Sequence, residues 1–254
     1  MLLGPGEGET ITDRAERTIR ILLSHELVDV TWTRYEPGER GPEPHVHYEH
    51  VDAFCVLSGE LEFGLGPAGA DTVRAPAGTA AVVPPGVVHT FGNESGATAT
   101  FLNLHAPSTG FADSLRARRD GRPVEPWDSF DPPADGGRPP SEALVSPPGE
   151  GELLEGGIRH HRIKVDLPQL SVIELGFLPG FEGVDPHTHS DHVDAFFVQD
   201  GEVDFTIGSD VRRAGPGVFV AAAPGARHGF RHKGRISMLN FHAPDTGFAG
   251  RLRR

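Results

Sequence analysis

HVHYEHVDAFCVLSGELEFGLG, residues 45–66, is the stretch that decides the fold, because the chain contains it twice. Residues 187–208 read HTHSDHVDAFFVQDGEVDFTIG, so the histidines, an aspartate and an apolar run recur at the same spacing. The repeat extends outward, since GTAAVVPPGVVHTF (78–91) corresponds to GVFVAAAPGARHGF (217–230) and NLHAPSTGF (103–111) to NFHAPDTGF (240–248). A match over most of each half predicts two copies of one structural module in tandem.

Each copy consists of short apolar runs separated by turn-forming residues. VDVTWTRY (28–35) and DAFCVL (52–57) are two such runs, and the chain contains 33 glycines and 23 prolines. Runs of this length with this punctuation are typical of strands in a β-sandwich or barrel. The sequence therefore predicts an all-β protein in which alternate residues of each strand face inward.

We predict three segments along the chain. Residues 1–112 form a first barrel and residues 148–254 a second. Residues 113–147 form a linker rich in proline and glycine, with a short helix at its start that FADSLRARR (111–119) indicates. Because this composition disfavours a packed core, the linker is expected to be an extended connector rather than a folded unit.

Composition and charge exclude several classes of function. The 254 residues carry a formal net charge of −13, which argues against nucleic-acid and anionic-membrane partners. No run approaches the 18 apolar residues of a membrane span, and the first residues lack a signal-peptide pattern. Cys55 is the single cysteine, so no disulfide forms within the chain, and its apolar run predicts a buried thiol. We expect a cytoplasmic protein. The exposed strand edges predict either a homodimer, in which a second copy covers them, or an internal pseudo-dimer, in which the two halves of one chain cover each other.

Histidines are the residues that carry the chemistry. Ten of the 14 fall at paired positions of the two halves. His45 and His47 are two apart, so both rings point to one side of a strand. Asp52 begins the next strand and His89 a distant one. The second copy supplies the same set: His187, His189, Asp194 and His228.

Three imidazoles and one carboxylate suit a divalent ion of Fe, Mn, Ni, Co, Cu or Zn, with room left for water or substrate. Up to two ions per chain are predicted. The alternative, a group of surface-loop histidines or a satisfied polar network, explains less well why all four residues recur in register.

Two further pairs have open roles. His50 and His192 stand two residues before the aspartates. They could replace the aspartate as ligand, hydrogen-bond it from behind, or lie exposed on the rim. His105 and His242 share the NxHAP segment, where capping a strand end is favoured over lining the cavity.

The motifs of the chain resemble those of the cupin superfamily. The second cupin motif, G(X)5PXG(X)2H(X)3N, is met by Gly78, Pro84, Gly86, His89 and Asn93. The first, G(X)5HXH(X)3–4E(X)6G, is met by His45, His47 and Gly59, with Asp52 in place of the usual glutamate and Gly38 one residue early. In the second half Ala223 and His232 replace the proline and the asparagine. Because aspartate is one methylene shorter than glutamate, the fourth ligand is either the aspartate (Asp52 or Asp194) or the neighbouring histidine (His50 or His192).

This resemblance implies a bicupin, two tandem jelly-roll barrels that each hold a metal in the mouth. The tandem form is similar to the quercetinase, oxalate decarboxylase and gentisate dioxygenase branches. Aromatic residues are expected mainly in the barrel cores, and those at the mouth would suit a flat ligand: Tyr35, Phe54, Phe63, Phe91 and Phe101, with Phe177, Phe196, Phe205 and Phe230.

The expected function is that of a metal-dependent oxidoreductase. No arginine is identified at paired inward positions, which favours a flavonol-like, phenolic or enolic substrate over oxalate. A dioxygenase of the quercetinase type, with dioxygen as second substrate, is the leading hypothesis. The alternatives are a non-catalytic metal-dependent protein that binds or senses a small ligand, and a metal-dependent isomerase or lyase.

Overall fold

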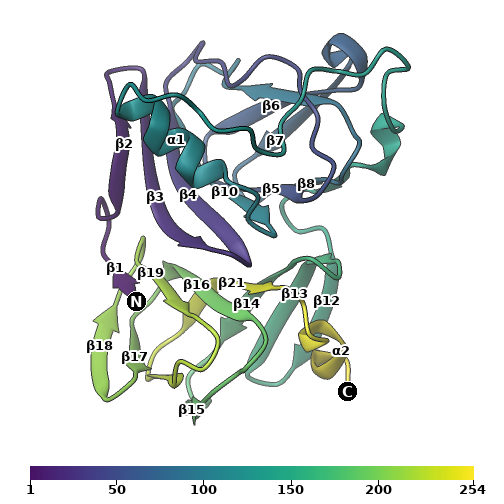
Figure 1. The fold of residues 1–254 in the computed structure, drawn as a ribbon. Coiled ribbons are helices and arrows are strands. Elements are labelled where there is room, and N and C mark those ends of the chain that lie inside the picture. The colour runs from purple at the N-terminus through teal and green to yellow at the C-terminus, as the bar shows by residue number, and fades with distance from the viewer. The chain divides into compact units, whose positions relative to one another are not determined.

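Antiparallel strands make up both halves of the chain (Figure 1). A computed structural model describes the backbone of residues 1–254 and every side chain except that of Ala68. The chain divides into two compact units, one of Gly8–Glu150 and the other of Met1–Glu7 together with Gly151–Arg254. The prediction of an all-β protein with two tandem jelly-roll barrels is confirmed.

The unit of residues 8–150 consists, in its described part, of a seven-stranded sheet facing a three-stranded one. The strand orders are β11-β8-β5-β10-β4-β3-β2 and β7-β6-β9. The strands are β2 (Glu9–Asp13), β3 (Arg17–His25), β4 (Val28–Tyr35), β5 (Val51–Ser58), β6 (Glu60–Leu65), β7 (Asp71–Pro76), β8 (Ala80–Val83), β9 (His89–Gly92), β10 (Ala99–Ala106) and β11 (Leu144–Ser146). The expected helix is present as α1 (Phe111–Arg119), which packs Ala112 and Leu115 against Ile21; two 3₁₀ turns cover Pro67–Gly69 and Pro140–Glu142.

The second unit repeats this plan with a seven-stranded and a four-stranded sheet in the described chain. The orders are β1-β19-β16-β21-β14-β13-β12 and β15-β20-β17-β18. The strands are β1 (Leu2–Leu3), β12 (Glu152–Gly156), β13 (Arg159–Asp166), β14 (Ser171–Phe177), β15 (Gly183–His187), β16 (Val193–Asp200), β17 (Val203–Ile207), β18 (Asp210–Ala214), β19 (Phe219–Ala222), β20 (His228–His232) and β21 (Ile236–Ala243). Helix α2 (Phe248–Leu252) follows β21 and is the counterpart of α1. No described helix is long and apolar enough to cross a membrane.

The first strand of each repeat pairs with the sheet of the other repeat. Leu2 of β1 lies opposite Val220 of β19, and Leu144 of β11 lies opposite Val82 of β8. Each short apolar strand thereby covers backbone groups that an edge strand would leave unpaired. This exchange moves residues 1–7 out of the first barrel, to which the predicted boundary of 1–112 assigned them.

The connector also differs from the extended linker that we predicted over residues 113–147. Its residues group with the first barrel. Three of its parts make defined contacts: β11 pairs with β8, Asp128 is buried, and the backbone of Phe130 forms a bridge with Val46. Composition indicated a solvated chain because proline and glycine dominate it, but a few apolar and acidic side chains are enough to hold it against the barrel.

The alternation of inward residues on β5 positions the site. Phe54 and Val56 lie in the apolar core with Phe63 and Phe101. Asp52, two residues earlier on the same face, is also buried but lies beyond this core, among histidines. The period-two pattern therefore places one carboxylate at the mouth of an otherwise apolar barrel.

Candidate metal centres

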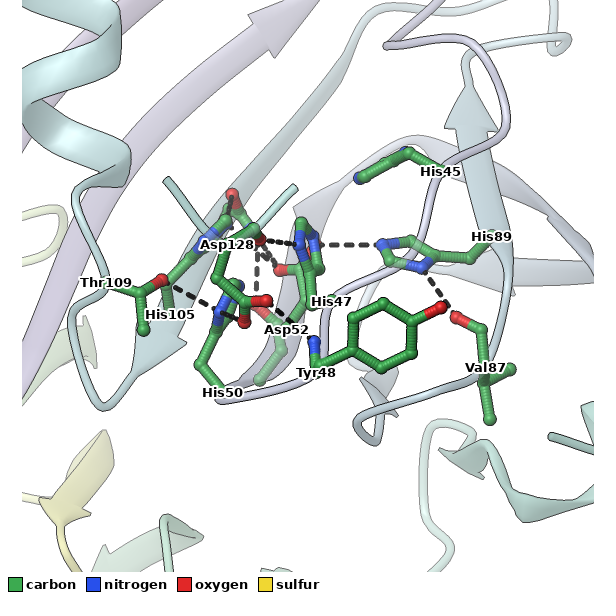
Figure 2. Close-up of polar contacts among 12 residues, drawn as sticks. His45, His47, Tyr48, His50, Asp52, Val87, His89, His105, Thr109 and Asp128 are labelled. Atoms are coloured by element: carbon green, nitrogen blue, oxygen red, sulfur yellow. Dashed lines mark hydrogen bonds and ion pairs between the residues drawn. The ribbon is translucent and has the colours of Figure 1, made fainter. Parts of the chain in front are cut away.

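The first histidine cluster lies where two strand ends meet. His45 and His47 precede β5, Asp52 is its second residue, and His89 begins β9. The backbones of His45 and His89 are hydrogen-bonded to each other in both directions, at 3.0 and 2.9 Å. One ligand atom from each of the four side chains lies within 4.8 Å of the others, so the structure brings the predicted set together (Figure 2).

Backbone carbonyls orient the three imidazoles. The Nδ1 of each ring faces a carbonyl oxygen: Glu43 for His45 (3.0 Å), Asp128 for His47 (2.5 Å) and Val87 for His89 (3.2 Å). A carbonyl can only accept, so each Nδ1 carries the proton, and the Nε2 atoms of His45 and His47 keep their lone pairs. The Nε2 of His47 is buried and has no hydrogen-bond partner among the described residues. A buried lone pair of this kind fits a metal ligand.

Asp52 supplies a fixed negative charge to this cluster. Its Oδ2 lies 3.2 Å from the Nε2 of His89, and the amide of Asn103 donates a hydrogen bond to its Oδ1. Burial would raise the pKa of Asp52, but the imidazoles of His105 and His89 hold that pKa well below its usual range. The aspartate thus reaches the histidines despite its shorter side chain, and stays ionised.

The imidazoles of His45 and His47 are neutral. Burial lowers the pKa of His45 to about 4, with the neighbouring His89 adding to the effect. Burial likewise places the pKa of His47 far below its ordinary value. A neutral imidazole is the form that binds a metal, so these side chains need to lose no proton at neutral pH.

A segment of the connector closes the first cluster, and we call residues 127–130 the strap. The side chain of Asp128, 3% exposed, accepts hydrogen bonds from the backbone N–H groups of Tyr48 (2.8 Å) and Glu49 (2.7 Å). It also accepts one from Nδ1 of His50 at 2.7 Å. Figure 2 shows Asp128 lying over the loop that carries His47 and His50.

Trp127 adds an aromatic cover to the same cluster. Its ring centroid lies 5.6 Å from those of His47 and Phe111 and 6.0 Å from that of His105. Sequence reasoning missed both strap residues because the composition around them is that of a linker. A lone tryptophan followed by an acid, within a proline-rich segment, was the only available signal.

The second cluster has the same four residue types on equivalent elements. His187 ends β15, Asp194 lies in β16 and His228 begins β20; with His189 their ligand atoms lie within 4.8 Å of one another. Nε2 of His187 and Nε2 of His189 are 3.0 Å apart. Two nitrogens about 2.1 Å from one ion, at a right angle, would be about 3 Å apart. The donor set therefore fits a single ion.

The electrostatics of the second cluster follow those of the first. The amide of Asn240 donates to Asp194 at 2.6 Å, and the Nε2 of His228 lies 3.1 Å from the same carboxylate. Burial opposes ionisation of Asp194, yet His242 and His228 keep its pKa low. Burial would also lower the pKa of His228, but the hydrogen bond to Asp194 raises it, whereas burial lowers that of His189 to about 4.

A cavity of about 310 Å³ opens onto this second cluster. The side chain of His189 is 22% exposed, against 2% for His47 in the first barrel. The walls include Phe177, Phe181 and Phe230 and two arginines, Arg159 and Arg251. Sequence analysis identified no arginine at paired inward positions, so Arg159, whose counterpart in the first repeat is Arg17, is a correction; it lies on β13, outside the two histidine motifs.

His50 and His192 lie beside the clusters and not within the sets of three histidines and an aspartate. Both are buried, which excludes an exposed position on the rim. Nδ1 of His50 bonds to Asp128, as described, and Nδ1 of His192 to Asp191 at 2.7 Å. His50 also forms a second compact group with His47 and Asp128.

His105 and His242 face the aspartates, whereas sequence analysis favoured capping of a strand end. The Nε2 of His105 lies 3.4 Å from Asp52, and that of His242 lies 3.2 Å from Asp194. The cause is strand register: His105 lies opposite Asp52, and His242 opposite Asp194, in the central sheet pairs. Pairing partners of this kind cannot be read from one strand alone.

Comparisons with known proteins agree with this architecture. The family model "Cupin domain" matches residues 31–105 and 174–242, more than half of the chain. The chain belongs to the cupin family. Its two matched regions each contain one histidine cluster, and the tandem, two-domain arrangement of this cupin is confirmed. A search of curated proteins found no match.

Solved structures share the whole fold of this cupin at low sequence identity. An oxalate decarboxylase of Lactobacillus farciminis is 12% identical with a TM-score of 0.64, covering 96% of this chain and 86% of that one. The 7S globulin of Momordica charantia is 14% identical with a TM-score of 0.61, covering 97% and 84%. AerE of Microcystis aeruginosa is 13% identical with a TM-score of 0.64, covering 96% and 99%. At these identities the likeness extends to the fold alone.

Proposed function

We propose that this bicupin is a metal-dependent oxidoreductase, a dioxygenase of the quercetinase-like type, that acts on a small phenolic or enolic compound at its C-terminal cluster. The observation that carries the proposal is the coincidence of two features. Three histidines and an aspartate converge within 4.8 Å, and a partly aromatic cavity of about 310 Å³ opens onto them. In the first barrel three histidines and an aspartate converge in the same way, but the strap lies against His47.

His187, His189, Asp194 and His228 would hold the ion, and His45, His47, Asp52 and His89 a second one. Fe, Mn, Ni, Co, Cu and Zn all accept this donor set. When bound at the open cluster, such an ion supplies Lewis acidity and, if redox-active, electron transfer between substrate and dioxygen. His50 and His192 support the ligand loops from behind, since their Nδ1 atoms bond to Asp128 and Asp191.

The protein's own residues prepare the cavity for a flat oxygenated ligand. Phe177 and Phe181 stack with centroids 4.5 Å apart, and Phe230 lies 5.7 Å from Phe177. These rings exclude water from one side of a bound ring and hold it by apolar contact. On the other side, His242 and Asn240 fix the ionised carboxylate of Asp194, which keeps the imidazoles in one orientation.

Oxygen uptake with a defined substrate panel tests this function. Tag-free protein is loaded with each candidate metal and assayed with flavonols, catechols and 1,3-diketones. The proposal predicts oxygen uptake matched by substrate loss with at least one class. Absence of uptake with every metal and class would contradict it. If the zinc form turns over substrate without oxygen, the protein is a lyase or isomerase instead. If it binds a substrate tightly without turnover, it is a ligand-binding protein.

A further inference from the structure

Two arginines at the cavity of the second barrel have no carboxylate partner. Arg159 and Arg251 both line this cavity. Among the described residues, no aspartate or glutamate oxygen lies within ion-pair distance of either guanidinium. Each lies instead over an aromatic ring: Arg159 is 4.6 Å from the centroid of Phe181, and Arg251 is 5.8 Å from that of Phe248. Their charges are free to meet an anion.

In the first barrel, the arginine at the position equivalent to Arg159 has a carboxylate partner. Arg17 is the counterpart of Arg159, and it forms a 2.5 Å ion pair with Glu39. The residue at the position of Glu39 in the second repeat is Phe181. The second repeat thus has a phenyl ring where the first has a carboxylate. Arg159 therefore lacks an ion-pair partner, and the cavity gains an apolar wall.

His161 lines the same cavity as Arg159. It is buried and has a Nδ1 without a hydrogen-bond partner among the described residues. Burial lowers the pKa of His161 to about 4, and the positive charge of Arg159 contributes to the same direction. In the first repeat this position is Ile19, so the second cavity has gained a polar atom as well as an unpaired cation.

We infer that the C-terminal cavity takes an aromatic or enolic carboxylate, whose anionic group meets Arg159 and Arg251 while its ring lies against Phe177, Phe181 and Phe230. This inference rests on the proposed function and narrows its substrate class. A neutral flavonol would leave both guanidinium groups without a partner. A small dicarboxylate would leave the aromatic walls without an apolar contact, so the combination selects a ring that bears one carboxylate.

Binding of salicylate and of its neutral amide, salicylamide, tests the inference. Titration calorimetry on the full-length protein with its metal measures both affinities for wild type, Arg159→Gln and Arg251→Gln. Wild type should bind salicylate at least about tenfold more tightly than salicylamide, because a charged hydrogen bond is the stronger one. Each substitution should reduce this preference severalfold without changing the affinity for salicylamide. Both side chains are exposed, so neither variant is expected to alter folding.

Arg17→Gln is the matched control, because it removes the equivalent arginine of the first barrel. It should leave both affinities unchanged. Equal binding of the two probes by wild type, or equal effects of Arg17→Gln and Arg159→Gln, would overturn the inference. Chelation of the probes by the metal is the same in every variant, so it cannot produce a difference in preference between wild type and Arg159→Gln or Arg251→Gln. Oxygen uptake is measured separately: carboxylate preference without uptake retains this inference and overturns only the proposed oxidation.

Discussion

The two histidine clusters share their ligand types and differ in what surrounds them. In the first barrel, Trp127 lies against the imidazole of His47, and the carbonyl of Asp128 fixes the ring of the same residue. In the second barrel, His189 is partly exposed to a cavity lined by aromatic rings and arginines. The repeat has thus kept one coordination set while its coverings diverged.

This difference separates two uses of one site. A cluster whose His47 is buried under a strap favours a structural ion, because a structural site is closed by protein groups. An open cluster with an adjacent cavity allows a ligand to reach a free coordination position. We therefore assign stability to the first site and reaction to the second, and the predictions below test this division.

The largest expected effect is on turnover. His189→Ala should lower oxygen uptake with the best substrate by about 100-fold or more, because it removes a ligand at the open site. The equivalent His47→Ala should lower uptake less than about threefold when assayed at a temperature at which it stays folded. Comparable losses in both variants would show that the covered cluster also reacts, and would break the comparison.

The next effect is on stability, and it concerns the strap. Asp128→Ala leaves the N–H groups of Tyr48 and Glu49 without their acceptor, and leaves the Nδ1 of His50 with only the hydroxyl of Thr109 as a partner. We expect the free energy of unfolding of the first barrel to fall by about 2–4 kcal/mol, as measured by urea denaturation.

Asp191→Ala is the control for the strap. Asp191 also accepts from a histidine, His192, at 2.7 Å, but its side chain is 63% exposed. Water can replace this acceptor, so the loss should stay below about 0.5 kcal/mol. A loss at Asp191 as large as that at Asp128 would mean that the strap does not distinguish the two barrels.

The smallest effect depends on pH and concerns His161, whose counterpart is Ile19. Its folded pKa of about 4 lies below the ordinary value of 6.5, so the unfolded chain binds a proton that the folded chain does not between these values. Folding stability is therefore lost as pH falls from about 6.5 towards 4. His161→Leu removes this loss, and should stabilise the protein at pH 5 by on the order of 2 kcal/mol more than at pH 7.

Urea denaturation at both pH values measures this difference. Ile19→Leu, the same replacement at the counterpart position, should change stability equally at the two pH values because neither residue titrates. An effect of His161→Leu that is independent of pH would show that His161 is already protonated, or solvated, in the folded protein.

The repeated sequence predicted the fold and which histidines and aspartates come together, because both depend on local pattern. Alternation on β5 placed Asp52 in line with Phe54 and Val56, and the spacing of His45 and His47 put both rings on one side. Duplication strengthened each inference, because a pattern that arose by chance in one half would not recur in register in the other. The quercetinase-like activity stays a prediction, because the fold that the relatives share does not determine a reaction.

What the sequence did not predict depends on partners that lie far away along the chain. The covering of His47 by Trp127 and Asp128 joins positions about 80 residues apart. The exchange of β1 and β11 between repeats, and the position of Arg159 at the cavity, depend on strand order in the same way. Composition indicated a linker and a period-two pattern indicated strands, but neither gives the neighbours of a strand within a sheet.

The metal content of tag-free protein tests the central claim most directly. Elemental mass spectrometry is applied to wild type, His47→Ala and His189→Ala, each checked for folding by circular dichroism. Two separate clusters predict about two divalent ions per chain in wild type and about one in each variant. A wild type without bound metal, or variants that both retain two ions per chain, would contradict the account.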